Sequence, residues 1–490
     1  MAAPRRRRGG RRHRPQRGRH ADVVRPQREA RLVPPHLGRE PAQTRNHAEA
    51  LPRRNVDGAK RREPALPQAR PGRRAPAGHA RDPDAAGAPE DDLAVISHLA
   101  AAAVALALGV PAATPGVTAT TITLGGTVPL TGPAAAYGSV GRGADAYFKY
   151  VNSKGGVYGR KIVYKYEDDE FDVAKTISLT RQLVEQDNVL AIFNSVGTEH
   201  ALAIRPYLND RKVPQLFVGS GVSKLATDHK KYPWSMGYLP SFAGEGTIYG
   251  RYVAVHQPTA RIAVLYENSD FGKDMLAGLR RGLGAKAKIV ATQAYEVEDN
   301  DVSSQLAKLK SSGADTLMLF ATPKFAILGY VDSFRVGWHP RTYITSVSIS
   351  PDIMNIARTS TSQKQVEGSI SIAFVKDPTS SQWARDKTVQ LYKTILRRFL
   401  PSAKPDDVFN YYGMAVAYTM VDTLRKAGRN LTRDSVLRAA THLDETNPFL
   451  LPGVRIQTSP NDYYPMDKVR LARYHGMHWQ FFGNLVKTHG

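Results

Sequence analysis

Short apolar runs rich in β-branched residues alternate with amphipathic stretches along the chain from Thr120 onward. The short runs predict strands, and the stretches with apolar residues at helical spacing predict helices. The run at 122–128 breaks at Pro129, and a turn at 131–133 leads into a helical pattern that ends at Gly155. A second strand follows. This order is typical of parallel sheets with crossover helices.

The same alternation continues to the end of the chain. Strands are predicted at residues 122–128, 161–166, 190–193, 215–218, 261–266, 289–295, 316–320, 342–345 and 368–373. Helices are predicted at residues 176–186, 200–209, 272–283, 302–311, 326–336, 381–399, 410–427 and 432–441. Three further strands, at residues 454–457, 469–475 and 479–482, are expected as antiparallel additions. So many strands predict two α/β lobes, although the pattern alone does not give the strand order.

Residues 1–92 differ in composition from the rest of the chain. They hold 23 Lys and Arg against 11 Asp and Glu, and they lack Ser, Ile, Phe, Tyr, Trp and Cys. So little apolar surface cannot offset the entropy of ordering, and we expect a disordered basic segment. It is either a basic arm that binds nucleic acid or a translated upstream region. In the second case the true start lies near Leu93 or Val95.

Residues 99–110 form an unbroken apolar run of 12 residues, followed by small residues. This length is too short to span a bilayer and suits the core of a signal peptide. We therefore expect a signal peptide at 93–119 and a mature chain that begins between Ala113 and Thr121. A buried or merely Ala-rich helix is the alternative, because the usual positive flank is missing.

Several classes of chemistry are excluded or unsupported. The chain has no cysteine, which excludes disulfides, thiolate catalysis and a lipid anchor on cysteine. No Walker-type phosphate loop, HExxH motif or GxSxG motif occurs at a strand-to-helix turn. We therefore expect neither an enzyme nor a cofactor.

Two loops stand where a ligand of an open α/β sheet binds, beyond the carboxyl ends of strands and at helix N-termini. They are residues 194–198 and 219–223, and both offer hydroxyls and accessible backbone N–H groups suited to a carboxylate. Thr198 and Ser223 are the candidate side chains. Helix N-capping explains each of them equally well.

Three motifs follow one another near the start of the folded region: PLTGPAAAYG at 129–138, VNSKGGVYGRKI at 151–162 and YEDDEFD at 166–172. With the ending LLPGVRIQTSPNDYYPMDKV, they resemble the leucine/isoleucine/valine-binding family of periplasmic solute receptors, the substrate-capturing subunits of ABC importers. The resemblance covers nearly all of residues 120–490. It implies that the acidic residues 167–170 form a solvated turn rather than a metal site.

The resemblance also implies a fold. It is the type I periplasmic binding protein fold, with two Rossmann-like lobes joined by three crossovers and a ligand cleft between them. Lobe one would comprise residues 120–238 and 372–450, and lobe two residues 239–371 and 451–490.

Site residues are implied by the same resemblance. Thr198 and Ser223 fall on the two hydroxyl positions that hold an amino-acid carboxylate, beside the loop residues Gly197, Gly221 and Val222. Tyr137 and Phe271 fall where the family places aromatic side chains around the ligand. Packing across the cleft is the alternative for both aromatics.

Two positions depart from the family pattern. Val347 stands in the loop where amino-acid-binding members carry an acidic partner for the ligand ammonium, and Thr322 stands where an aromatic wall is expected. A buried ammonium without a counter-charge is costly. We therefore expect a carboxylate or neutral polar compound rather than an ordinary branched-chain amino acid. Lys324 is either a positive partner for it or a solvated surface residue.

Together these features predict the solute-binding component of an ABC importer, periplasmic or extracytoplasmic and not a lipoprotein. Its expected partners are a small-molecule ligand and ABC permease subunits at the membrane, with no nucleic acid, and the protein is expected to be a monomer. A ligand-sensing module of a regulatory system with the same fold is the alternative.

Overall fold

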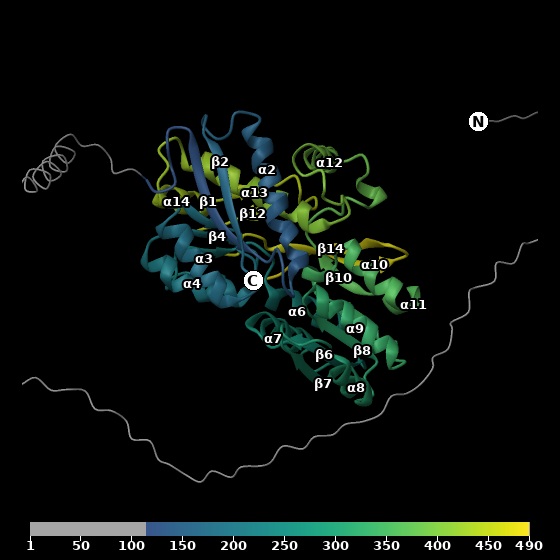
Figure 1. Ribbon diagram of the computed structural model, residues 1–490. Coiled ribbons are helices and arrows are strands. Elements are labelled where there is room, and N and C mark those ends of the chain that lie inside the picture. The colour runs from purple at the N-terminus through teal and green to yellow at the C-terminus, as the bar shows by residue number, and fades with distance from the viewer. Residues whose placement is uncertain (1–113, 490) are drawn as a thin grey trace, which may run out of the picture. The chain divides into compact units, whose positions relative to one another are not determined.

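The computed structural model describes residues 114–489, which are built around two open sheets flanked by helices (Figure 1). The first sheet has five parallel strands in the order β2-β1-β3-β4-β5. These strands are β1 (Thr121–Val128), β2 (Lys161–Asp168), β3 (Ala191–Phe193), β4 (Gln215–Val218) and β5 (Ser235–Gly237). The connecting segments are η1 (Ala135–Tyr137), α2 (Gly138–Asn152), α3 (Val173–Glu185), α4 (Thr198–Asp210) and α5 (Lys224–Thr227).

The second sheet has seven strands in the order β14-β13-β10-β9-β8-β6-β7. The parallel strands are β6 (Arg261–Glu267), β7 (Lys288–Tyr295), β8 (Thr316–Phe320), β9 (Arg341–Ile344) and β10 (Ile370–Ala373). The antiparallel additions are β13 (Lys468–His475) and β14 (His478–Lys487). The associated helices are α6 (Phe242–His256), α7 (Asp270–Leu283), α8 (Ser303–Ser311), α9 (Pro323–Arg335), η2 (Ser346–Ser348), α10 (Pro351–Ser360) and α11 (Gln363–Val366).

The remaining elements return the chain to the first sheet. They are η3 (Ser381–Trp383), α12 (Lys387–Phe399), α13 (Val408–Ala427), α14 (Arg433–Ala440), β11 (Asp444–Glu445) and β12 (Ile456–Gln457). Both α12 and α13 pack against α2, far from them in sequence (Figure 1). The chain thus passes between the two sheets three times, after β5, after β10 and after β12.

We call the first sheet with α2–α5 and α12–α14 lobe one, and the second sheet with α6–α11 lobe two. The predicted α/β fold of two lobes joined by three crossovers is confirmed. The residue bounds given for each lobe from the sequence stay a prediction.

Most predicted elements lie within a few residues of their observed bounds, and two differ in kind. The predicted strand at 454–457 shortens to β12, which pairs with β11 in a separate two-stranded sheet instead of joining lobe two. The predicted helix at 381–399 breaks into η3 and α12. The break occurs because Asp386 caps α12, accepting hydrogen bonds from Thr388 N at 2.9 Å and Val389 N at 3.1 Å.

The sequence pattern does not reveal helix α6. Its buried residues surround the helix instead of forming one stripe, because α7 packs very closely against it. An ideal Cβ on Gly246 would lie 2.2 Å from Met275 O, and one on Gly278 would lie 2.0 Å from Ala243 O. The two helices can approach this closely only because both positions are glycine.

The N-terminal predictions fall mostly outside the described residues. The basic segment at 1–92 and the apolar run at 99–110 lie there entirely. Of the predicted signal peptide, only residues 114–119 are described. They turn back onto β1, where Gly116 O accepts a hydrogen bond from Thr123 N at 2.7 Å and Val117 bridges to Ile122.

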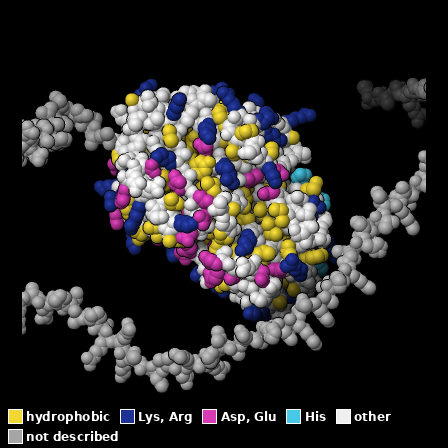
Figure 2. All heavy atoms as spheres, viewed as in Figure 1, with side chains coloured by type: hydrophobic (Ala, Val, Ile, Leu, Met, Phe, Trp, Pro, Cys, Tyr) yellow, Lys and Arg dark blue, Asp and Glu magenta, His cyan; other side chains and the backbone are white. Residues whose placement is uncertain are grey.

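Charges on the described surface are mixed. On the face seen in Figure 2, Lys and Arg side chains are scattered and interspersed with Asp and Glu rather than gathered in one stripe. Within residues 114–489 no helix combines the length and apolar character needed to cross a membrane.

Because α6 and α7 approach so closely, adding one methyl group between them should strongly reduce the stability of the protein. Gly278→Ala forces these helices apart, and we expect the free energy of unfolding to fall by about 1–3 kcal/mol, the usual cost of overpacking. Urea unfolding measures it. Lys273→Ala, at an exposed position of the same helix, is the control and should change stability by less than about 0.5 kcal/mol. Equal stability of both variants would contradict the packing described.

Candidate functional site

A pocket of about 120 Å³ lies between the lobes, lined by residues that follow strands of both sheets. Parallel strands of one sheet end at the same edge, so the loops after β1, β3, β6, β8 and β9 meet there. Most of the wall is apolar. Its aromatic members are Tyr137, Phe171, Phe242, Phe271, Phe374, Phe409, Tyr412, Trp479 and Phe481.

Thr198 lies at the lobe-one wall of the pocket, as the first residue of α4. Its side chain is 8% exposed, and its Oγ1 lies 2.8 Å from Ser220 Oγ. Gly197, not Thr198, is the N-cap residue of α4, and no side chain caps this helix. The N-capping explanation is therefore wrong for Thr198. Helix α4 thus begins at the pocket wall without a capping side chain, and an uncapped helix N-terminus suits an anion.

The second predicted loop lies differently. Gly221, Val222 and Ser223 are not among the residues that line the pocket. Val222 is buried in the core, and Ser223 N instead donates to Asp274 Oδ2 of α7 at 2.6 Å. The structure therefore does not bring Ser223 to Thr198. Ser220 occupies that place, because its Oγ turns back toward Thr198 and also accepts from Val222 N at 3.2 Å.

The predicted aromatic residues both line the pocket. Tyr137 is buried in lobe one, and its hydroxyl donates across the cleft to Val347 O of lobe two at 3.2 Å. Its ring packs edge to face against Phe409 at 5.1 Å. Phe271 packs in the same way against Phe242 at 4.8 Å. Both side chains thus combine packing within the cleft with a surface offered to a ligand.

Val347 lines the pocket on a loop that a buried carboxylate holds in place. Glu245 of α6 accepts hydrogen bonds from Ser346 N and Ser346 Oγ, both at 2.7 Å, and from the Tyr249 hydroxyl at 2.7 Å. Burial raises the pKa of Glu245. This side chain does not line the pocket. It fixes the loop whose backbone carbonyl receives the Tyr137 hydroxyl.

Thr322 lines the pocket beside a second buried carboxylate, Glu267 at the end of β6. Glu267 is 6% exposed and accepts hydrogen bonds from Ser269 Oγ at 2.8 Å, Tyr295 OH at 3.1 Å and Thr322 Oγ1 at 3.3 Å. The pocket wall therefore contains a carboxylate. This removes the reason given above for expecting a ligand without an ammonium group.

Glu267 was not among the residues singled out from the sequence. The only signal was its position at the end of an apolar strand in the run YENSDFG, one turn before Phe271. That position is shared by many structural acidic residues, so it does not distinguish a pocket side chain.

Two further charged residues line the pocket, Lys376 and Asp377. Lys376 Nζ is already paired, with Asp386 Oδ2 at 2.8 Å and Pro448 O at 2.8 Å. Asp377 Oδ1 accepts from Thr379 N at 2.8 Å. Lys324 is not a lining residue, since its Nζ donates to Asp299 O at 2.6 Å.

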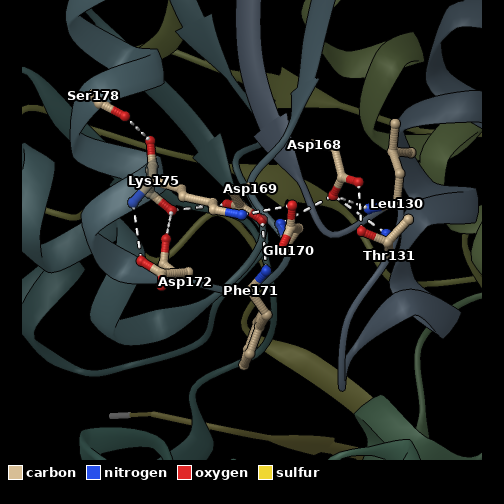
Figure 3. Close-up of polar contacts among 10 residues, drawn as sticks. Leu130, Thr131, Asp168, Asp169, Glu170, Phe171, Asp172, Lys175 and Ser178 are labelled. Carbon is tan, nitrogen blue, oxygen red and sulfur yellow. Dashed lines mark hydrogen bonds and ion pairs between the residues drawn. The ribbon is translucent and has the colours of Figure 1, made fainter.

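The acidic residues at the end of β2 and in the turn after it accept hydrogen bonds from two loops that lead to the pocket (Figure 3). Asp168 accepts from Leu130 N at 2.9 Å and Thr131 Oγ1 at 2.7 Å, which holds the loop leading to Tyr137. Asp169 accepts from Phe171 N at 3.1 Å, and Phe171 lines the pocket. Asp169 is fully buried, so the expectation of a solvated turn is wrong at this residue, because backbone and Thr176 donors replace water.

No group of three or more His, Cys, Asp or Glu side chains within the described residues is arranged to hold a metal ion. The polar groups of the pocket are instead hydroxyls, single carboxylates and the paired ammonium of Lys376. Such a set can bind and orient an organic molecule by hydrogen bonds.

Comparison with known proteins gives the family. The family described as "Periplasmic binding protein" matches residues 121–476. A Leu/Ile/Val-binding protein homolog from Brucella suis is 22% identical over 333 residues, which cover 66% of this chain and 82% of that protein.

Solved structures agree on the fold. A branched chain amino acid ABC transporter structure from Thermus thermophilus with bound valine has a TM-score of 0.67 at 17% identity, over 76% of this chain and 97% of that one. A solute binding protein of an ABC transporter from Rhodopseudomonas palustris, in complex with 3,4-dihydroxybenzoic acid, has a TM-score of 0.62 at 18% identity, over 75% and 96%.

Fold, cleft and pocket together define a two-lobed solute-binding protein. The chain belongs to the periplasmic binding protein family, and the predicted resemblance to its leucine/isoleucine/valine-binding members is confirmed. Members of this family bind solutes outside the cytoplasm.

A titratable group beside the pocket predicts a pH effect. Asp407 caps α13 next to Phe409, accepting from Phe409 N at 3.0 Å. Burial, with a smaller contribution from the charge of Asp352, raises the pKa of Asp407 to about 6. Between about pH 4 and 6 the folded protein therefore holds a proton that the unfolded chain has lost, so this group's contribution to stability falls as pH rises through that window.

Asp407→Asn removes this dependence while keeping a capping side chain. Relative to the natural protein, the variant should gain up to about 3 kcal/mol of unfolding free energy between pH 4 and pH 7. Urea unfolding at several pH values measures the difference. The exposed Asp210→Asn change controls for loss of one negative charge, and a trend equal in both variants would contradict the role of Asp407.

Proposed function

We propose that the pocket captures a small organic acid or amide, amino-acid-like in size, with its polar head at the N-terminus of α4. The observation that supports this is the uncapped first turn of α4, where Thr198 lines an otherwise aromatic pocket. Backbone N–H groups and the helix dipole favour an anion at that point. The apolar body of the ligand would lie among the aromatic side chains, with Tyr137 and Phe271 on either side.

Direct contacts between the lobes support capture by hinge closure. Besides the Tyr137 to Val347 bond, Glu199 Oε1 of lobe one accepts from Asp270 N of lobe two at 2.6 Å. Lys224 Nζ pairs with Asp270 Oδ2 at 2.6 Å. A ligand held between the lobes binds the closed arrangement better than the open one, and this differential affinity shifts the population toward closure.

The closed form would then be presented to ABC permease subunits, with the protein acting as a monomer. Both solved structures described above belong to ABC transporters, which favours import over the sensing alternative. The bound molecules named for them, valine and 3,4-dihydroxybenzoic acid, both carry a carboxylate beside an apolar or aromatic body. That shared chemistry supports the same ligand class here.

Thr198→Ala tests the proposed polar subsite. Loss of one charge-assisted hydrogen bond should weaken binding of a carboxylate ligand by about 10- to 100-fold. Thr198→Ser keeps the hydroxyl and should retain affinity. Calorimetric titration, after a thermal-shift screen over small carboxylates, amides and amino acids, measures the change.

Ser223→Ala is the matched control, because its side chain lies outside the pocket and the natural ligand affinity should persist. If Ser223→Ala weakens binding as much as Thr198→Ala, the loop 219–223 reaches the ligand as the sequence predicts. Unchanged affinity in Thr198→Ala would contradict the subsite at α4.

A further inference from the structure

Glu267 has a feature that its structural role does not explain. Its three hydrogen-bond partners lie at the ends of three strands. Ser269 follows β6, Tyr295 is the last residue of β7, and Thr322 follows β8. All three donors are neutral hydroxyls, and no ion pair to Glu267 is found within residues 114–489. A buried carboxylate without a cation is costly to maintain.

The hydrogen-bond directions identify Glu267 as an acceptor. Thr322 N donates to the Tyr295 hydroxyl oxygen at 3.0 Å, which leaves the Tyr295 proton free to point at Glu267 Oε2. Oε2 thus faces Tyr295 and Thr322, whereas Oε1 receives only Ser269 Oγ. An ionised carboxylate has about four acceptor positions. One position on Oε1 is therefore left for another donor.

The surroundings restrict where that donor can come from. Glu267 lines the pocket, and most of its neighbours in the wall, such as Phe271 and Phe242, are apolar and have no donor to offer. Thr198 and the N-terminus of α4 lie on the opposite lobe. A ligand anchored by a carboxylate at α4 would approach Glu267 with another of its groups.

We propose that Glu267 is a specificity-determining residue that accepts a hydrogen bond from the ligand, so that the pocket selects acids carrying a second, donor group, either an ammonium or a hydroxyl. This inference rests on the proposed function and names its substrate class more narrowly. The ammonium or hydroxyl of the ligand would donate to Glu267 at the end of β6. In amino-acid-binding relatives the acidic partner is expected in the loop after β9, where this chain has Val347.

Two pairs of acids, matched except for the donor, test the inference on the full chain by calorimetric titration. Leucine against 4-methylpentanoate tests an ammonium donor, and 4-hydroxybenzoate against benzoate tests a hydroxyl donor. The natural protein should prefer the donor-bearing member of at least one pair by about tenfold or more, the effect of one charge-assisted hydrogen bond. This comparison requires no variant to fold.

Variants then assign the preference to one residue. Glu267→Gln keeps the shape of the side chain and should reduce the preference at least about tenfold. The affinity for the donor-bearing acid should fall, whereas the affinity for its matched partner should stay the same. Asp210→Asn, an exposed carboxylate that does not line the pocket, should leave the preference intact. A merely structural role of Glu267 would weaken both members of a pair alike.

The outcomes separate this inference from the proposed function. Equal binding within both pairs by the natural protein overturns the role of Glu267 and leaves the carboxylate subsite standing. A preference that persists unchanged in Glu267→Gln overturns it as well. Binding of none of the four acids contradicts the proposed carboxylate site itself, and the inference falls with it.

Discussion

The parallel strands of both sheets end at the cleft, and this constraint decides most of the residues that can touch a solute. In a parallel sheet all carboxyl ends lie on one edge, so the loops that follow them converge whatever their separation in sequence. Two such edges face each other here. The pocket therefore draws on residues as far apart as Tyr137, Thr198, Glu267 and Val347.

Hydrogen bonds within the protein hold the buried carboxylates at this cleft in place without a ligand. Glu245 fixes Ser346, and Glu267 joins the ends of three strands, both through neutral donors. Burying a carboxylate is tolerated only when its hydrogen bonds are supplied. The loops that carry Val347 and Thr322 are thus set in place, and the aromatic wall between them keeps its shape.

Some of the contacts between the lobes are made by residues of the pocket wall or by their close neighbours in sequence. Tyr137 lines the pocket and also donates to Val347 across the cleft. Helix α7 carries Phe271 into the wall and offers Asp270 and Asp274 to lobe one. A ligand that contacts Tyr137 or Phe271 would therefore lie against elements that join the lobes, which is the arrangement that the proposed capture by closure requires.

The sequence alone determined the alternation of elements and hence the fold class. Continuous apolar runs predicted the bounds of β4 and β8, because each strand is buried along its whole length. The resemblance to the family singled out Tyr137, Gly197, Thr198, Phe271, Thr322 and Val347, and all six line the pocket. Only the tertiary structure decided that Ser220 and not Ser223 faces Thr198, and that Glu245 and Glu267 serve the pocket. Such choices depend on which way a side chain turns within a loop and on which helix packs behind it, as at the glycine contacts of α6 and α7, and no local pattern in the chain encodes either.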